Sequence, residues 1–312
     1  MWQVVSGVFL GWSLGSNDAS NVFGTAVASR MISFWTAAIL CSVFVVLGAI
    51  LGGQEGIETY RKLSPMVPNM AFVVALAAGL TVTLMSFMSL PVSTSQAVVG
   101  ALVVIGLLQQ NLDTSSLVKV VLCWVGTPIG AALMTIVLYF TVGKLLNFLF
   151  PSLFMWDRGL RVALMIAGSY GAYALGANNV ANVTGPFVGP DGLTPFMATL
   201  IGSLAIAFGV ITYSRKVMIT VGKNLVRLDA FTAFIAILAE AATVHIYAMV
   251  GVPVSTSQAI VGAVLGVGLI KGAQTINTKT LWRILFGWIG TPVIAGGVAF
   301  LLYQAFVLTK LV

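Results

Sequence analysis

Two clusters of amide and carboxylate side chains interrupt an otherwise apolar sequence. Gly-Ser-Asn-Asp-Ala-Ser-Asn at 15–21 matches Gly-Ala-Asn-Asn-Val-Ala-Asn at 176–182. Residues four apart share one face of a helix, so the first and last Asn of each cluster can point at the same place. Amide and carboxylate oxygens suit sodium or another hard cation, although amides also join helices in membrane bundles. We predict a cation site formed by Asn17, Asp18, Asn21, Asn178, Asn179 and Asn182, with sodium held at Asn17, Asp18, Asn178 and Asn179.

A second motif pair is rich in hydroxyl groups. Pro-Val-Ser-Thr-Ser-Gln-Ala occurs identically at 91–97 and 253–259. Proline favours the first turn of a helix, where backbone N–H groups lack intrahelical partners and attract anions together with the helix dipole. Two such ends would surround a tetrahedral oxyanion with neutral donors, whereas a single copy would read as an ordinary helix cap. We predict phosphate binding by Ser93, Thr94, Ser95, Gln96, Ser255, Thr256, Ser257 and Gln258.

Few other side chains could carry chemistry. Glu240 is a candidate coupling residue that could hold a proton or cation, or else a paired structural residue, and His245 is expected to be a hydrogen-bonded packing residue. A carboxylate at membrane depth is costly and usually functional, which makes Asp18 the sharpest single candidate. One histidine, no metal-ligand cluster and no acid–base pair leave little for catalysis, so we expect that the protein is not an enzyme.

The composition places these motifs in a membrane protein. Of 312 residues, 59% are hydrophobic and 7% are charged, and the mean hydropathy is +1.05. A soluble domain carries about a quarter charged residues, so most of the outer surface must face lipid. The net charge of +7 comes without a basic cluster that contains interleaved aromatics, so nucleic acid is not an expected partner.

The elements that must position the motifs are apolar runs of membrane-spanning length, about 17 to 25 residues. The runs that contain the amide clusters are long and include Gly, Asn and Ser, so we predict broken helices there. The ten runs fall at residues 2–29, 33–52, 68–89, 91–108, 115–142, 160–188, 194–212, 228–249, 253–270 and 280–308.

The two halves of the chain are copies of each other. A third motif pair, Cys-Trp-Val-Gly-Thr-Pro at 123–128 and Gly-Trp-Ile-Gly-Thr-Pro at 287–292, follows the other two in order, and the offsets are 161, 162 and 164 residues. Unrelated apolar helices would share composition but not three polar motifs in sequence. We predict an all-α integral membrane protein of two repeats, residues 1–142 and 160–312, joined by a cytoplasmic linker at 143–159.

An odd number of crossings in each half would insert the second copy upside down. With five crossings per half, four basic residues (Arg61, Lys62, Lys119 and Lys310) fall on one side of the membrane. The other side holds the remaining eleven basic residues, which are Arg30, Lys144, Arg158, Arg161, Arg215, Lys216, Lys223, Arg227, Lys271, Lys279 and Arg283. By the positive-inside rule the richer side is cytoplasmic and both termini are extracellular.

Two of the runs allow a different arrangement. The segments at 91–108 and 253–270 could be re-entrant hairpins that return to the same side, and the count of basic residues would then have to be repeated. Broken or re-entrant helices in matching positions of inverted-topology repeats point to a midplane binding site.

At these motifs the sequence resembles the inorganic phosphate transporter (PiT) family, whose signature is a Gly-Ala-Asn-Asp-like motif in each half. The resemblance covers essentially the whole chain and implies symport of phosphate with sodium, or with protons in some bacterial members. Sulfate-transporting relatives also exist. Many members carry Asp in both signature copies, whereas this chain has Asn179 in the second, which removes one charge and leaves the number of coupling ions open.

We therefore predict a multi-pass plasma-membrane transporter that imports inorganic phosphate with sodium by alternating access. Sodium is the coupling ion, no cofactor is expected, and a homodimer is suggested by analogy alone. The alternatives are proton coupling through Asp18, Glu240 or His245, a sulfate permease, and an anion channel that uses the same helix ends.

Overall fold

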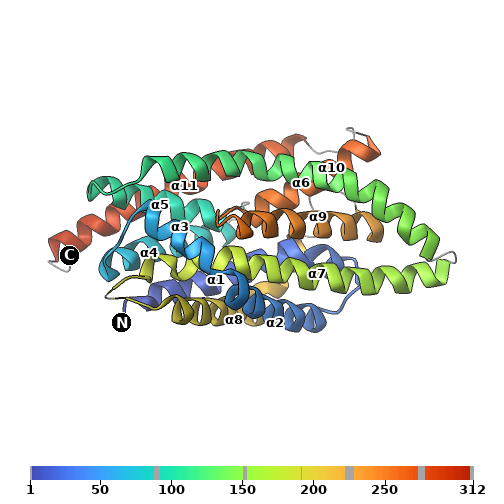
Figure 1. The fold of residues 1–312 in the computed structure, drawn as a ribbon, viewed down its shortest axis with the longest axis horizontal. Helices are drawn as coiled ribbons and strands as arrows, with labels where there is room; N and C mark the ends of the chain where they lie inside the picture. The colour runs from blue at the N-terminus through green and yellow to red at the C-terminus, as the bar shows by residue number, and fades with distance from the viewer. Residues whose placement is uncertain are drawn as a thin grey trace.

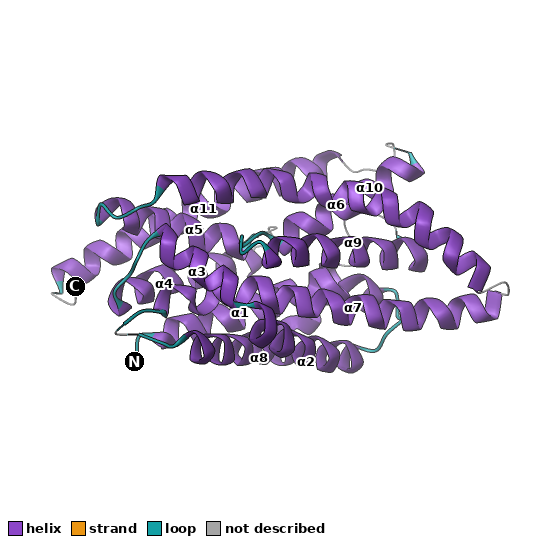
Figure 2. Cartoon of the chain, in the orientation of Figure 1, coloured by secondary structure: helices purple, strands orange, loops and turns teal. Residues whose placement is uncertain are grey.

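The chain folds into a long bundle of helices. The computed structural model describes residues 2–87, 92–149, 153–190, 192–221, 228–272 and 278–309, so that Pro91, Lys223, Arg227 and Lys310 lie outside the described residues. Apart from an isolated bridge between Val188 and Leu193, these residues form helices and their connections (Figures 1 and 2). The helices are α1 Val4–Ala28, α2 Phe34–Gly52, α3 Gln54–Leu63, α4 Pro68–Phe87, α5 Thr94–Leu108, α6 Thr114–Leu149, α7 Leu153–Thr184, the 3-10 turn η1 Gly185–Phe187, α8 Pro195–Val221, α9 Ala230–Met249, α10 Thr256–Lys271 and α11 Thr278–Leu308.

Each of the ten predicted apolar runs overlaps one of these helices, and several of the helices extend beyond the run. Seven described helices, α2, α4, α6, α7, α8, α9 and α11, are long and apolar enough to cross a membrane. The helix α1 is also long, at 25 residues, but it is not one of these seven helices, and its sequence includes the polar first amide cluster. With 15 and 16 residues, α5 and α10 are shorter than the roughly 20 residues that a membrane crossing needs.

The helices α4 and α5 form a hairpin whose outer ends lie together. Just before α4, the hydroxyl of Ser64 donates to the Asn111 side chain (2.8 Å), which follows α5. The backbone N–H of Asp113 donates to the carbonyl of Leu63 (2.9 Å). The helix α4 runs beside α1, where Ser13 and Thr83 share a hydrogen bond of 2.9 Å. The two arms therefore enter and leave at the same end of the bundle.

A second hairpin is formed by α9 and α10. Its outer ends are joined by an ion pair between Lys271 and Asp229, with Nζ and Oδ2 2.5 Å apart. The Asp229 side chain also accepts from the N–H of Thr232 at the start of α9 (2.9 Å). Partial burial raises the pKa of Asp229, but the hydrogen bonds to Lys271 and Thr232 and the charge of Lys271 outweigh it and lower the pKa.

The inner ends of the two hairpins meet inside the bundle. The hydroxyl of Ser95 donates to the carbonyl of Val254 (2.9 Å), and Ser257 makes the matching bond to Val92 (3.0 Å). Both valines are buried, and Figure 2 shows loop segments in the interior of the helical bundle. Two crossing helices per half would have placed these segments on opposite membrane surfaces. The meeting of these turns inside the bundle favours the re-entrant arrangement over five crossings per half.

The sequence predicted broken helices at the two amide clusters, but the structure has continuous helices there. Both α1 and α7 continue as α-helices through the amide clusters, and α7 changes to a 3-10 turn only at Gly185. Glycine in these helices serves close packing instead of a break. A Cβ atom on Gly15 would overlap the carbonyl oxygen of Ile206, and one on Gly176 would overlap that of Val45.

These contacts are repeated between the halves. Gly15 of α1 packs against α8, and in the same way Gly176 of α7 packs against α2. The contact of Gly48 with the backbone of Tyr173 likewise corresponds to that of Gly209 with the backbone of Trp12. Each member of a pair is shifted by the same 161 residues from its counterpart. In Figure 1 the first hairpin lies toward the end that holds both termini, and the second lies toward the junction of α6 and α7. The contacts support two equivalent halves, while their inverted insertion in a membrane stays a prediction.

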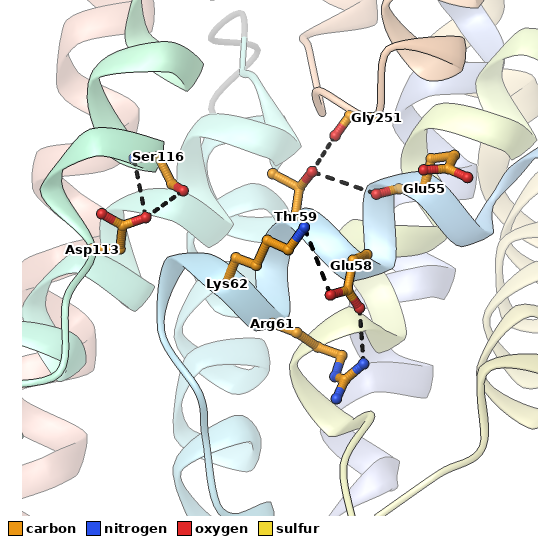
Figure 3. Close-up of polar contacts among 8 residues, drawn as sticks. All are labelled: Glu55, Glu58, Thr59, Arg61, Lys62, Asp113, Ser116 and Gly251. Atoms are coloured by element: carbon orange, nitrogen blue, oxygen red, sulfur yellow. Dashed lines mark hydrogen bonds and ion pairs between the residues drawn. The ribbon is translucent and has the colours of Figure 1, made fainter.

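The helix α3 lies in a stretch that the sequence analysis treated as a connection. Its polar face carries Glu58, which pairs with Arg61 at 2.8 Å and with Lys62 at 3.9 Å (Figure 3). Thr59 donates to the carbonyl of Gly251, so α3 contacts the turn of the second hairpin. That turn uses glycine because φ is +73° there.

Helical structure also extends into the predicted linker at 143–159. The helix α6 continues to Leu149 and α7 begins at Leu153, with 150–152 outside the described residues. At the other end of α6, hydrogen bonds from Ser116 and Ser115 hold the pKa of Asp113 at about 2. Figure 3 shows the contacts of Asp113 with Ser116. Asp113 therefore caps α6 as a carboxylate.

Candidate functional site

The carboxylate of Asp18 lies where the two halves meet. Asp18 is 2% exposed. Its Oδ2 accepts from Nδ2 of Asn179 at 3.1 Å and from the hydroxyl of Thr256 at 3.3 Å. The three side chains come from α1, α7 and α10, so one carboxylate joins the first signature helix to the second and to the inner end of a hairpin.

The second amide cluster forms a connected network. Nδ2 of Asn178 donates to Oδ1 of Asn179 (2.6 Å) and to the carbonyl of Val254 (2.8 Å), and its Oδ1 accepts from the N–H of Val254 (3.0 Å). Nδ2 of Asn182 also donates to Oδ1 of Asn179, at 3.0 Å. These bonds satisfy backbone groups of the hairpin turn that would otherwise be buried without partners.

The last Asn of each cluster reaches the hairpin of the opposite half. Asn21 donates to Ser257 at 3.2 Å and to Thr256 at 3.4 Å. Asn182 donates to Ser95 at 3.0 Å in the equivalent position. The structure thus brings the two predicted motif pairs together, and each helix end contacts the amide cluster of the other half.

Asn17 is the member of the predicted cation set that lies apart from this network. Its Nδ2 donates to the hydroxyl of Ser86 on α4 at 2.6 Å. No hydrogen bond within the described residues links its side chain to Asp18. Ser86 had not been singled out in the sequence, because a lone serine near the end of an apolar run carries no distinctive pattern.

The hydroxyl motifs do begin helices, but Pro253 does not occupy the first turn of α10. Ser93 and Ser255 are the N-caps of α5 and α10, and their hydroxyl oxygens accept from the N–H groups of Gln96 (3.3 Å) and Gln258 (3.2 Å). Pro253 stands two residues before its cap, in the extended turn. A phosphate role for the eight residues of these motifs stays a prediction.

Several buried oxygens of the site have no hydrogen-bond donor among the described residues. They are Oδ1 of Asp18, the hydroxyl oxygen of Thr94, and the side-chain carbonyl oxygens of Gln96 and Gln258. The amide groups of Asn21, Asn178, Asn179 and Asn182 already donate within the protein. Since buried acceptors without donors are unfavourable, a bound cation would satisfy them, and oxygen atoms are what sodium requires.

Glu240 is the second buried carboxyl group near Asp18. It lies in the middle of α9 and is 1% exposed, and neither carboxyl oxygen has a hydrogen-bond partner among the described residues. No lysine or arginine side chain of the described residues is buried. Asp18 and Glu240 therefore lack a buried basic counter-ion.

Two aromatic contacts complete the surroundings of the site. The hydroxyl of Tyr60 on α3 donates to Oδ1 of Asn182 at 2.5 Å, a contact that the sequence analysis missed. The buried residues Gly56, Ile57, Tyr60 and Leu63 are spaced as on one helix face, and this spacing is the signal that could have found it. His245 shares a 2.9 Å hydrogen bond with Tyr170, which confirms its packing role.

The fold and the site define a multi-span membrane protein in which two helical hairpins and two amide-bearing helices enclose a polar centre. The model of the phosphate transporter family matches residues 14–299. The chain belongs to this family. It is therefore a transporter and not an enzyme.

Similar proteins span the same length. A protein of Methanocaldococcus jannaschii that carries a phosphate-permease name is 30% identical, with 96% of this chain and 95% of that protein covered. The sulfate permease CysP of Bacillus subtilis is 29% identical, with 97% and 87% covered. A solved structure titled as the sodium-dependent phosphate transporter has 23% identity, a TM-score of 0.82, and coverage of 97% and 98%, which establishes the shared fold.

Proposed function

We propose that this protein imports inorganic phosphate together with sodium. The observation that carries the proposal is the convergence of both motif pairs around Asp18. Among the described residues, several buried oxygens there lack donors and no buried lysine or arginine balances the charge. Sodium would bind at the amide and carboxylate cluster, and phosphate at the inner ends of α5 and α10. The solved transporter of the same fold is sodium-dependent by its title, which supports the coupling ion.

The order of binding follows from which groups are free. Oxygen acceptors are unsatisfied, whereas the described amide donors of the cluster are already used. An anion that arrived first would face a carboxylate without a counter-charge. Sodium therefore binds first, and the oxyanion then accepts hydrogen bonds from backbone N–H groups at the two helix N-termini. Alternating access would follow from movement of one half against the other around this centre.

Phosphate is the proposed substrate because the chain belongs to the phosphate transporter family. Sulfate is the second candidate, since the sulfate permease of Bacillus subtilis is 29% identical over nearly the whole chain. Both are tetrahedral oxyanions that neutral donors can bind. The difference is the proton that phosphate carries near neutral pH.

The orientation in the plasma membrane is also part of the proposal. A hairpin returns to the side from which it came, so replacing two crossings with a hairpin leaves all later segments on the same side. The residues between the arms in the sequence, 88–93 and 250–255, include no Lys or Arg. The excess of basic residues therefore stays on the side of the α6–α7 junction, and both termini are extracellular.

The proposal is tested by uptake of radiolabelled phosphate into proteoliposomes with and without an inward sodium gradient. Wild type should accumulate phosphate only with the gradient, and Asp18→Asn should lose nearly all of this uptake. Asp157→Asn is the matched control, because its exposed carboxylate makes only a long ion pair of 3.9 Å with Arg161.

Three results would contradict parts of the proposal. Uptake that follows a pH gradient and ignores sodium would replace sodium with protons as the coupling ion. Excess unlabelled sulfate that abolishes phosphate uptake would favour a sulfate permease. Failure to accumulate phosphate above equilibrium under a sodium gradient would favour a channel.

A further inference from the structure

Glu240 occupies an environment in which a charge has no support. Its side chain lies against Gly171 of α7, where a Cβ atom would come within 3.4 Å of Oε2. Neither oxygen receives a hydrogen bond within the described residues. An ionised carboxylate without donors, solvent or a basic partner is strongly unfavourable, so the group must carry a proton or lie beside a bound cation.

The titratable groups around α9 do not supply the missing positive charge. The two that interact electrostatically with Glu240 are Asp18 on α1 and the thiol of Cys41 on α2. The others lie further along α9: His245 with Tyr170 and Tyr173 of α7, Glu55 of α3 at the inner end, and Tyr139 of α6, Asp229 and Lys271 of α10 at the outer end.

Asp18 and Glu240 differ in what supports them. Oδ2 of Asp18 accepts two hydrogen bonds, whereas Glu240 accepts none. Two carboxylates that interact in a low-dielectric interior repel each other, so both are ionised only when a cation is present. The negative charge therefore belongs on Asp18, and the proton belongs on Glu240.

We propose that Glu240 is a proton-binding site whose charge sets the affinity of the neighbouring cation site at Asp18. With Glu240 protonated, the cation at Asp18 is held by one carboxylate. When the proton leaves to solvent, the second negative charge strengthens cation binding. Because such coupling is reciprocal, sodium binding releases the proton from Glu240. The inference rests on the proposed sodium site, and it adds a proton to the groups that this site exchanges.

The first test measures sodium binding to the purified full-length protein at pH 6 and pH 8. Wild type should bind sodium at least about fivefold more tightly at the higher pH, the lower bound of typical coupling. Glu240→Gln should bind sodium with the weaker affinity at both pH values. Glu240→Asp should retain the pH dependence, and the exposed Glu58→Gln should behave as wild type. Thermal unfolding of each variant establishes that it is folded.

Infrared difference spectroscopy gives a readout that does not depend on transport. Addition of sodium should remove the carbonyl band of a protonated carboxylic acid in wild type and in Glu58→Gln. The band should be absent from Glu240→Gln and present in Asp18→Asn without sodium. If the proposed function fails but the Glu240 band titrates, only the link to sodium is lost.

Two outcomes would overturn the inference. A band that persists in Glu240→Gln and disappears in Asp18→Asn would assign the proton to Asp18. Loss of sodium binding at every pH by folded Glu240→Gln would make Glu240 a direct cation ligand instead of a proton site.

Discussion

At the scale of single residues, the site consists of matched pairs in which one pair is unequal. Asn21 and Asn182 contact equivalent serines, but Asp18 faces Asn179. The amide of Asn179 donates to the carboxylate across the boundary between the halves. The replacement of a second carboxylate by an amide therefore removes a repulsion and adds a hydrogen bond to the remaining charge.

Asn179→Asp should reverse this arrangement. Two facing carboxylates would repel, and Asp18 would lose a buried donor, which costs about 1–3 kcal/mol. We expect a lower midpoint of thermal unfolding in potassium or choline, and a larger recovery in sodium than wild type shows. Unfolding in matched sodium and choline salts measures this difference.

Asn179→Ala is the control for that experiment. It removes the donor to Asp18 without adding charge, and it also removes the oxygen that accepts from Asn178 and Asn182, so it should be destabilised but gain no more from sodium than wild type. If sodium stabilises the aspartate variant no better than the alanine variant, the cluster does not hold the cation.

At the scale of elements, helix ends and close helix packing build the site. The hairpin turns are held by the two serine hydroxyls, Ser95 and Ser257, each of which donates to the opposite turn and accepts from an asparagine. Each hydroxyl thus satisfies a buried carbonyl and a buried amide at once. The signature helices approach their neighbours closely through glycine, which lets the amides reach across the boundary.

Ser95→Ala should remove one of the two hydrogen bonds that join the hairpin turns, while the bond from Ser257 to Val92 remains. The carbonyl of Val254 and one donor of Asn182 would lose a partner, at a cost of about 1–3 kcal/mol. Phosphate uptake should fall strongly. Ser93→Ala removes the cap of α5, worth about 0.5–2 kcal/mol, and leaves the bonds between the two turns in place. The two uptake rates are compared in proteoliposomes, and a larger effect of Ser93→Ala would contradict the role given to Ser95.

Gly176→Ala should destabilise the protein, because the added Cβ would meet the backbone carbonyl of Val45, which cannot move by a rotamer change. Gly297→Ala on α11 is the matched control, since no atom lies within 4 Å of its Cβ position. That substitution should stabilise the helix by up to about 1 kcal/mol. Thermal unfolding of both variants in one detergent decides, and equal midpoints would show that the close approach of α7 to α2 is not required.

The sequence predicted the helical fold and the set of motifs that meet, because duplicated polar motifs in apolar runs leave few alternatives. It did not predict that α1 and α7 are continuous, since glycine has the same signature whether it breaks a helix or packs against one. The choice between crossings and hairpins depends on contacts such as Ser257 with Val92, which join residues far apart in the chain. The role of Tyr60 likewise depends on the position of α3.

At the scale of the whole molecule, the two hairpins approach the centre from opposite ends of the bundle. The hydrogen bond between Ser64 and Asn111 joins the outer ends of the first hairpin, and the ion pair between Asp229 and Lys271 joins those of the second. The inner ends of the two hairpins meet each other. Figure 1 shows both termini at the end that holds the first hairpin. If the bundle spans the membrane along its long axis, each hairpin opens to a different compartment.

Cysteine labelling in cells tests this arrangement and the proposed orientation together. In a background where Cys41 and Cys123 are replaced by serine, Lys62→Cys and Thr309→Cys probe the end with the termini, and Asp157→Cys probes the opposite end. The side chains of Lys62 and Asp157 are 67% and 64% exposed, so access is not limited by burial. The basic residues are concentrated at the end of Asp157, which the positive-inside rule makes cytoplasmic. A membrane-impermeant maleimide should therefore label the Lys62 and Thr309 positions in intact cells, and the Asp157 position only after permeabilisation. The reverse pattern would invert the transporter in the membrane, and labelling of all three positions in intact cells would refute the placement of the two ends on opposite sides.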